Sequence, residues 1–192
     1  MSYNIHPVNW FPTTVFHTQI DEQLCDKLIE KVMIDKDTWV KGLKNVHAKT
    51  TAKTTGWNCL DKYEEVDEIN LLMTKTLLPK IAENQNWKYN NLRTVHAWIN
   101  FYEKGDFAGL HNHTGSDFCA ILILKPGEGN LAFHNHRNIL GLSRSFEQLT
   151  DEKINEKKGT LIFFSPDLFH SVSDCQSDRI SVAFNFNNEA FE

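Results

Sequence analysis

The sequence lacks the features that mark membrane, secreted or nucleic-acid-binding proteins. No apolar run is long enough to span a membrane, and the start, "MSYNIHPVNW", lacks the basic-then-apolar form of a signal peptide. Basic residues number 20 against 25 acidic ones, and the net charge of −5 argues against a nucleic-acid partner. The four cysteines have no CxxC spacing, which favours free thiols in a reducing compartment. We therefore expect a cytoplasmic protein with no membrane contact.

The chain also lacks low-complexity linkers, repeats and blocks of like charge. Its 192 residues are enough for one full domain and few for two. We expect a single domain over 1–192, with a helical part at about 1–90 and a β core at about 91–187.

Two stretches in the first half have helical periodicity. Apolar residues in 21–34 form one helical stripe, and Asp21 is a plausible N-cap. A second pattern covers 64–84, where Pro79 should kink the helix or end its regular part.

From about residue 91 the pattern changes to that of strands. Strands are predicted at 94–102, 117–125, 129–133, 159–164 and 179–187, and a long polar loop at 138–158. The last strand has an apolar face, whereas its other face carries Arg179, Ser181 and Asn185. That second face is either the solvent side of a sheet or the wall of a pocket. Helices followed by strands indicate an α+β, mainly β, fold with helices on one face.

The tripeptide His-Asn-His occurs twice, at 111–113 and at 134–136. In extended backbone His111 and His113 point to the same side, so both imidazoles can reach one metal ion. His170 follows 57 residues after His113 and could supply a third ligand. Each histidine alone is more often structural than a ligand.

Several longer stretches carry a family resemblance: "FPTTVF", "TTGWNC", "NFYEKGDFAGLHNH", "GTLIFFSPDLFHSV" and "RISVAFNFN". The histidine pair, the distal His170 and an Arg-x-Ser at 179–181 resemble the iron(II)- and 2-oxoglutarate-dependent oxygenases. More narrowly, the stretches resemble a group of these oxygenases from marine bacteria and their phages. The resemblance implies a double-stranded β-helix, a jelly-roll and cupin-like core with buttressing helices. It also implies the cytoplasm of a bacterial or phage-infected cell.

The resemblance assigns roles to particular residues. His111, His113 and His170 would bind Fe(II). For 2-oxoglutarate, an arginine can hold a dicarboxylate by a bidentate pair, and a hydroxyl on the same strand face can add a donor. The co-substrate-binding residues implied in this way are Arg179, Ser181, Asn100 and Tyr102. The last two could equally be polar packing of the barrel interior.

The implied reaction couples decarboxylation of 2-oxoglutarate to succinate with oxidation, by default hydroxylation, of a second substrate. That substrate would be a small molecule or a protein side chain, and the sequence does not choose between them. Possible substrate contacts are Trp98, Asn185, His134 and His136. For the last two, solvent-exposed loop residues are the simpler interpretation.

The chain departs from the family at one position. Most of the superfamily has a carboxylate where this chain has His113, so the metal site would be a neutral tri-histidine site. Asp106 and Asp117 could supply a carboxylate, but neither has the same-side spacing from His111.

Two other functions are compatible with the sequence. One is a cupin-like tri-histidine dioxygenase that does not use 2-oxoglutarate, which would leave Arg179 and Ser181 without a role. The other is a non-catalytic jelly-roll binding module. The apolar segment "NWFPTTVF" could also take part in a homodimer.

Overall fold

A computed structural model describes residues 14–42, 49–87, 91–129, 131–134 and 156–188. Its helical elements are α1 (Glu22–Asp35), the 3₁₀ turn η1 (Lys36–Thr38), α2 (Glu64–Leu72), the π-helical turn η2 (Met73–Leu77) and α3 (Leu78–Asn84). The strands are β1 (Phe16–Gln19), β2 (Val40–Lys41), β3 (Lys53–Thr54), β4 (Leu92–Tyr102), β5 (Ala108–His111), β6 (Phe118–Lys125), β7 (Leu131–His134), β8 (Thr160–Phe164), β9 (Phe169–Val172) and β10 (Arg179–Asn188). None of the described helices is long and apolar enough to cross a membrane.

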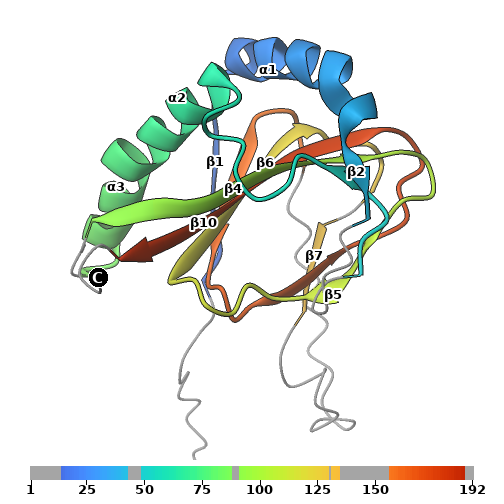
Figure 1. Cartoon of the computed structure of the whole chain (residues 1–192). Helices are drawn as coiled ribbons and strands as arrows, with labels where there is room; N and C mark the ends of the chain where they lie inside the picture. Colours follow the sequence, from blue (N-terminus) through green and yellow to red (C-terminus); the bar gives the residue numbers. More distant parts are fainter. Residues whose placement is uncertain (1–13, 43–48, 88–90, 130, 135–155, 189–192) are drawn as a thin grey trace, which may run out of the picture.

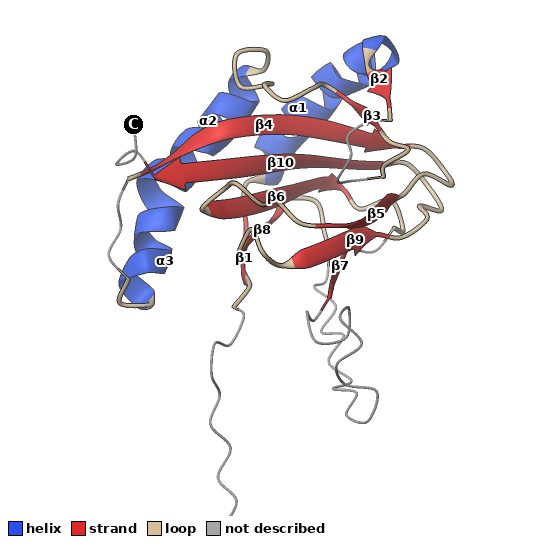
Figure 2. Ribbon diagram, turned by 60° about the horizontal axis from the view of Figure 1, so that its bottom comes forward, coloured by secondary structure: helices blue, strands red, loops and turns tan. Residues whose placement is uncertain are grey.

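The strands form two antiparallel sheets that face each other (Figures 1 and 2). The larger sheet has the order β1-β8-β6-β10-β4-β3-β2, and the smaller has the order β5-β9-β7. An apolar cluster joins the sheets, with Ile121 and Ile162 on the larger sheet and Leu131 and Val172 on the smaller. This arrangement confirms the double-stranded β-helix expected from the sequence.

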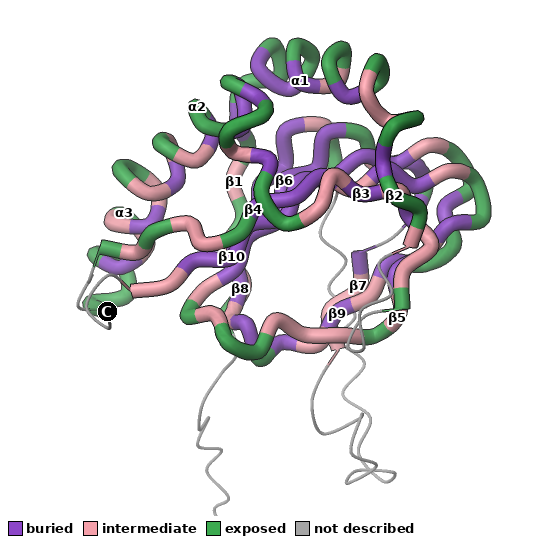
Figure 3. The backbone as a smooth tube through the Cα atoms, viewed as in Figure 1, coloured by how far each residue is buried: buried purple, intermediate pink, exposed green. Residues whose placement is uncertain are grey.

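The helices cover the outer face of the larger sheet (Figure 1), and both the helices and the strands of this sheet contain buried residues, coloured purple in Figure 3. Leu28 of α1 and Ile69 of α2 are fully buried in one cluster with Phe184 of β10. Each buried side chain of this size contributes roughly 1.5–3 kcal/mol relative to exposure. Asp21 caps α1 as expected, since its carboxylate accepts a hydrogen bond from the amide of Gln23 at 2.8 Å.

The second predicted helix is interrupted where Pro79 disturbs it. The regular α-helix ends at Leu72, the π-helical turn η2 follows, and Pro79 lies in the first turn of α3. Proline has no amide hydrogen to donate and its ring crowds the preceding turn, so the regular hydrogen-bond pattern cannot continue through it.

The five predicted strands correspond to β4, β6, β7, β8 and β10. Sequence periodicity missed β1, β2, β3, β5 and β9, which are runs of two to four residues in which alternation is hard to recognise. Among strands this short, β7 was predicted. Most of the loop predicted at 138–158 lies outside the described residues, which resume at 156.

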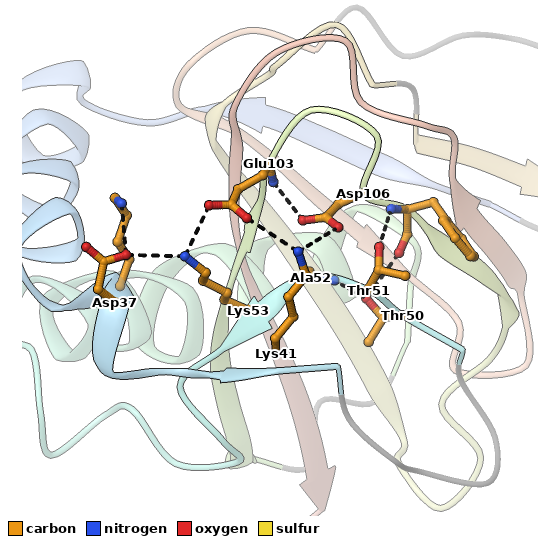
Figure 4. Close-up of polar contacts among 10 residues, drawn as sticks. Asp37, Lys41, Thr50, Thr51, Ala52, Lys53, Glu103 and Asp106 are labelled. Carbon is orange, nitrogen blue, oxygen red and sulfur yellow. Dashed lines mark hydrogen bonds and ion pairs between the residues drawn. The ribbon is translucent and has the colours of Figure 1, made fainter.

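A polar network fastens the turn between β4 and β5 to the edge strands (Figure 4). The Lys53 ammonium pairs with Asp37 at 3.2 Å and with Glu103 at 3.1 Å. Asp106, which is buried, accepts a hydrogen bond from the Glu103 amide at 2.9 Å, and Lys41 approaches its carboxylate at 3.6 Å. The network fixes the start of β5, the strand that leads to the first histidine pair.

Candidate metal centre and adjoining cavity

Three histidines meet at the end of the smaller sheet. His111 ends β5 and lies opposite His170 of β9 in the antiparallel register, while His113 follows two residues after His111. The ring centroids of His111 and His170 are 4.3 Å apart, and those of His113 and His170 are 5.0 Å apart. One potential ligand nitrogen from each ring lies within 4.8 Å of the others. The three histidines selected from the sequence as possible metal ligands therefore form a compact cluster in the structure.

Hydrogen bonds fix the orientation of all three rings. The Nδ1 atom of His111 lies 2.7 Å from the Gly109 carbonyl, and that of His170 lies 3.0 Å from the Leu168 carbonyl. Carbonyl oxygens only accept hydrogen bonds, so each Nδ1 donates.

The third ring is held by a side chain. His113 Nδ1 lies 2.7 Å from Asn185 Oδ1 and donates to it. With every Nδ1 protonated, each Nε2 keeps its lone pair available for a metal.

Burial keeps these histidines neutral. It lowers the pKa of His113 to about 4 and that of His170 well below its ordinary value, and it lowers the pKa of His111 as well. A hydrogen bond to Asn185 opposes the shift at His113, and the neighbouring His111 adds to it. Near neutral pH the cluster is thus uncharged, the form that binds a metal ion.

The two aspartates considered as alternative ligands lie elsewhere. Asp106 belongs to the network in Figure 4, and the Asp117 carboxylate accepts a hydrogen bond from the Asn188 amide at 2.7 Å. Within the described part of the chain, the metal-ligand cluster at this site contains the three histidines and no carboxylate.

A cavity of about 290 Å³ adjoins the cluster. All three histidines line it, together with the four residues implied for 2-oxoglutarate: Arg179, Ser181, Asn100 and Tyr102. The pairing of β10 with β4 explains this, because Arg179 lies opposite Tyr102 and Ser181 lies opposite Asn100. The polar face of the last strand is therefore the cavity wall rather than the solvent side of a sheet.

Arg179 is fully buried and lines the cavity. Its Nη1 donates to the carbonyls of Pro126 and Gly129, both at 2.9 Å, and lies 2.5 Å from the Glu156 carboxylate. Its Nε is buried without a hydrogen-bond partner in the described structure. Burial raises the pKa of Tyr102, so the phenol beside the guanidinium remains a protonated donor.

An aromatic row extends from the surface to the metal cluster. Trp57 is 43% exposed, and its ring centroid lies 5.1 Å from that of Trp98. Trp98 in turn lies 5.5 Å from the ring of His113. His96 lies 5.6 Å from Trp57, and all four rings line the cavity. The site therefore has one strongly apolar wall between solvent and the histidines.

The remaining predicted contacts have other surroundings. Asn185 lines the cavity but its carbonyl oxygen is used by His113. His134 ends β7, where its Nε2 lies 2.8 Å from Ser171 Oγ, and it is not part of the cavity wall. His136 lies outside the described residues.

Glu156 was missed by the sequence reasoning, since it lies in the stretch taken as a polar loop. Nothing in the surrounding residues sets it apart from the other acidic positions there. It could have been found from the sequence only by searching for an acidic residue to pair with Arg179, because a buried arginine needs a carboxylate partner.

These features define a class of protein: a double-stranded β-helix with a three-histidine cluster and a buried arginine that line one cavity. Residues 96–185 match the model of a family described as "Putative 2OG-Fe(II) oxygenase". This stretch, which carries the whole histidine cluster and Arg179, is therefore similar to the 2OG-Fe(II) oxygenase family. A search of curated proteins by sequence found no match.

Solved structures of similar fold include other oxygenases. A Pseudomonas putida prolyl-4-hydroxylase superposes with a TM-score of 0.67 at 15% identity, over 92% of this chain and 93% of its own. The viral collagen prolyl hydroxylase of Paramecium bursaria Chlorella virus-1, in complex with 2OG, superposes with a TM-score of 0.59 at 16% identity. The match covers 90% of this chain and 94% of the viral one. HygX from Streptomyces hygroscopicus, with nickel and 2-oxoglutarate bound, superposes with a TM-score of 0.62 at 10% identity. The match covers 93% of this chain and 84% of HygX. At these identities the likeness is one of fold.

Proposed function

We propose that His111, His113 and His170 bind Fe(II) through their Nε2 atoms, and that the adjoining cavity binds 2-oxoglutarate for the oxidation of a second substrate. The observation that carries the proposal is the set of three Nδ1 hydrogen bonds, which leaves the three Nε2 lone pairs free on rings that form one compact cluster. Imidazole is a suitable ligand type for iron.

The cavity residues fit a dicarboxylate. The buried Nε of Arg179 has no partner among the described residues, and an anion in the cavity would satisfy it. Tyr102 and Ser181 present hydroxyl groups to the same cavity and can donate to the same carboxylate.

With molecular oxygen as the oxidant, the metal and co-substrate would supply the oxidising chemistry: 2-oxoglutarate would give succinate and carbon dioxide, with one oxygen atom entering succinate and the other the second substrate. The protein's own residues bind and orient. Arg179 holds the distal carboxylate, the three histidines hold the metal, and Trp98 keeps water away from one side of it.

We propose hydroxylation of a small molecule or a protein side chain as the outcome. Two of the structural neighbours are prolyl hydroxylases by name. The exposed Trp57 and the buried Trp98 offer this substrate an apolar surface at the cavity mouth.

An anaerobic titration tests the assignment. Addition of 2-oxoglutarate to the Fe(II)-loaded protein should produce the visible charge-transfer band of a chelated co-substrate. Arg179→Ala should abolish the band at 2-oxoglutarate concentrations that saturate the wild type, while metal binding persists. Lys125→Ala is the matched control, because it removes an exposed cation close to Arg179 in the same sheet.

The alternatives predict other results. Metal uptake without the band would favour a tri-histidine dioxygenase that does not use 2-oxoglutarate, and absence of metal uptake would favour a non-catalytic module.

We further propose that the chain forms one oxygenase domain and works in the cytoplasm. The support for a reducing compartment is that Cys25, Cys59, Cys119 and Cys175 are all free and buried. A homodimer through the apolar segment "NWFPTTVF" stays a prediction, and most of this segment lies outside the described residues.

A further inference from the structure

The buried Glu156 pairs with Arg179 but does not line the cavity. Its Oε2 atom is 2.5 Å from Arg179 Nη1, and its Oε1 accepts a hydrogen bond from the Leu131 amide at 2.6 Å. Its side chain is 8% exposed, and it is not among the residues that line the cavity. Glu156 therefore does not occupy the co-substrate position.

The turn between β6 and β7 closes around this ion pair. The Nη1 atom that contacts Glu156 also donates to two carbonyls of that turn. Because Gly127 has no side chain, the turn can lie directly on the arginine: a Cβ there would come within 2.5 Å of Arg179 Cβ. The Nη1 atom of the guanidinium is thus fully occupied by contacts within the protein, whereas Nε has no partner among the described residues and is left for a ligand.

A charge count gives this ion pair a function. The histidine cluster is neutral, and among the described residues that line the cavity Arg179 alone carries a permanent charge. With Glu156 paired to it, the contribution of the described residues to the charge of the site sums to zero. A divalent metal and a doubly charged co-substrate also sum to zero, so the loaded site is neutral. Without Glu156 a buried excess positive charge would remain, and such a charge is costly in a dry interior.

We propose that Glu156 is a charge-balancing residue that compensates for the neutral ligand at position 113. In the resembling oxygenases the carboxylate sits on the metal; here His113 is neutral and the carboxylate sits beside the co-substrate arginine. This inference rests on the proposed function, because it assigns Glu156 a role toward the metal and 2-oxoglutarate.

A charge-exchange cycle tests the proposal. The readout is the dissociation constant of 2-oxoglutarate on the anaerobic Fe(II) protein, with metal affinity measured separately by chelator competition. Glu156→Gln makes the site more positive and should tighten 2-oxoglutarate binding by about tenfold. His113→Asp makes it more negative and should weaken binding by about tenfold. The double variant restores the charge and should lie within about threefold of the wild type.

Two further variants separate charge from shape. Glu156→Asp keeps the charge but loses reach, so it should bind 2-oxoglutarate within about threefold of the wild type. Glu128→Gln is the matched control: it removes an exposed carboxylate from the turn between β6 and β7 and should leave binding unchanged. Thermal unfolding verifies that each variant is folded.

The proposal is overturned if Glu156→Gln weakens binding or leaves it unchanged, or if the double variant shows no compensation. Either result would make Glu156 a packing partner of Arg179. If the wild type itself forms no complex with Fe(II) and 2-oxoglutarate, the proposed function fails instead, and the two failures are distinguishable.

Discussion

Asn185 shows how a single side chain can decide whether a histidine works as a ligand. Its Oδ1 accepts from His113 Nδ1, and the Cys119 thiol lies 3.5 Å from the same oxygen. An amide oxygen cannot donate, so the pair holds His113 with Nε2 unprotonated. The alternating pattern of the last strand correctly predicted that Asn185 lies on the cavity face, and we expected it to be a possible substrate contact. Strand alternation defines a face but not which neighbour a side chain will bond.

Replacement of Asn185 by alanine should weaken metal binding without unfolding the protein. Loss of a residue that orients a ligand typically costs about 10–100-fold in metal affinity, because the imidazole can then rotate and change tautomer. Competition with a chromophoric chelator measures this. Asn187→Ala is the control, since Asn187 is on the same face of β10 and bonds only to the 115–117 loop among the described residues. Equal affinities in the two variants would contradict the role given to Asn185.

At the level of elements, the pair of β4 and β10 builds one wall of the cavity. Their long alternating patterns predicted both strands and the polar face that carries Arg179, Ser181 and Asn100. The short strands β5 and β9 escaped prediction, although they carry His111 and His170 and bring these into register. Period-two alternation needs length, whereas pairing of a four-residue strand is decided by tertiary contacts that no local pattern encodes.

The turn between β6 and β7 should tolerate no side chain at Gly127. Gly127→Ala places a methyl group within 2.7 Å of the Arg179 backbone nitrogen and also strains a φ of +67°. We expect a loss of about 1–3 kcal/mol in the free energy of unfolding and weaker 2-oxoglutarate binding, because the turn must move off the arginine. Urea unfolding and the anaerobic titration measure the two effects.

Gly105→Ala separates backbone strain from collision. Gly105 has a φ of +86° but open space around its Cα, so the substitution there carries only the strain. It should destabilise the protein less than Gly127→Ala and leave 2-oxoglutarate binding intact. A similar loss of binding in both variants would mean that the turn does not position Arg179.

At the scale of the whole molecule, the two facing sheets and the loop after β5 remove the three histidines from water. Their lowered pKa values are a property of the assembled β-helix, because both sheets and the loop after β5 contribute to the burial. This collective effect could not be predicted from the sequence, which placed the histidines near one another but gave no measure of their exposure. It also links metal binding to the stability of the fold.

The metal-free protein should therefore lose stability as the pH falls from 6.5 toward 4. In the unfolded chain the histidines bind protons below an ordinary pKa of 6.5, while in the folded protein His113 resists protonation down to about 4. The unfolded state then holds more protons, so the free energy of unfolding falls with the pH across this window and is fully retained above it. Carboxylates with lowered pKa values, such as Glu103, change the free energy of unfolding only when the pH falls below about 4.5, the ordinary pKa of glutamate. Urea unfolding at pH 7.5 and 5.5 in the presence of a chelator measures the effect. His113→Gln, which cannot titrate, should show a shallower dependence, and a flat profile for the wild type between these two pH values would contradict the burial of the cluster.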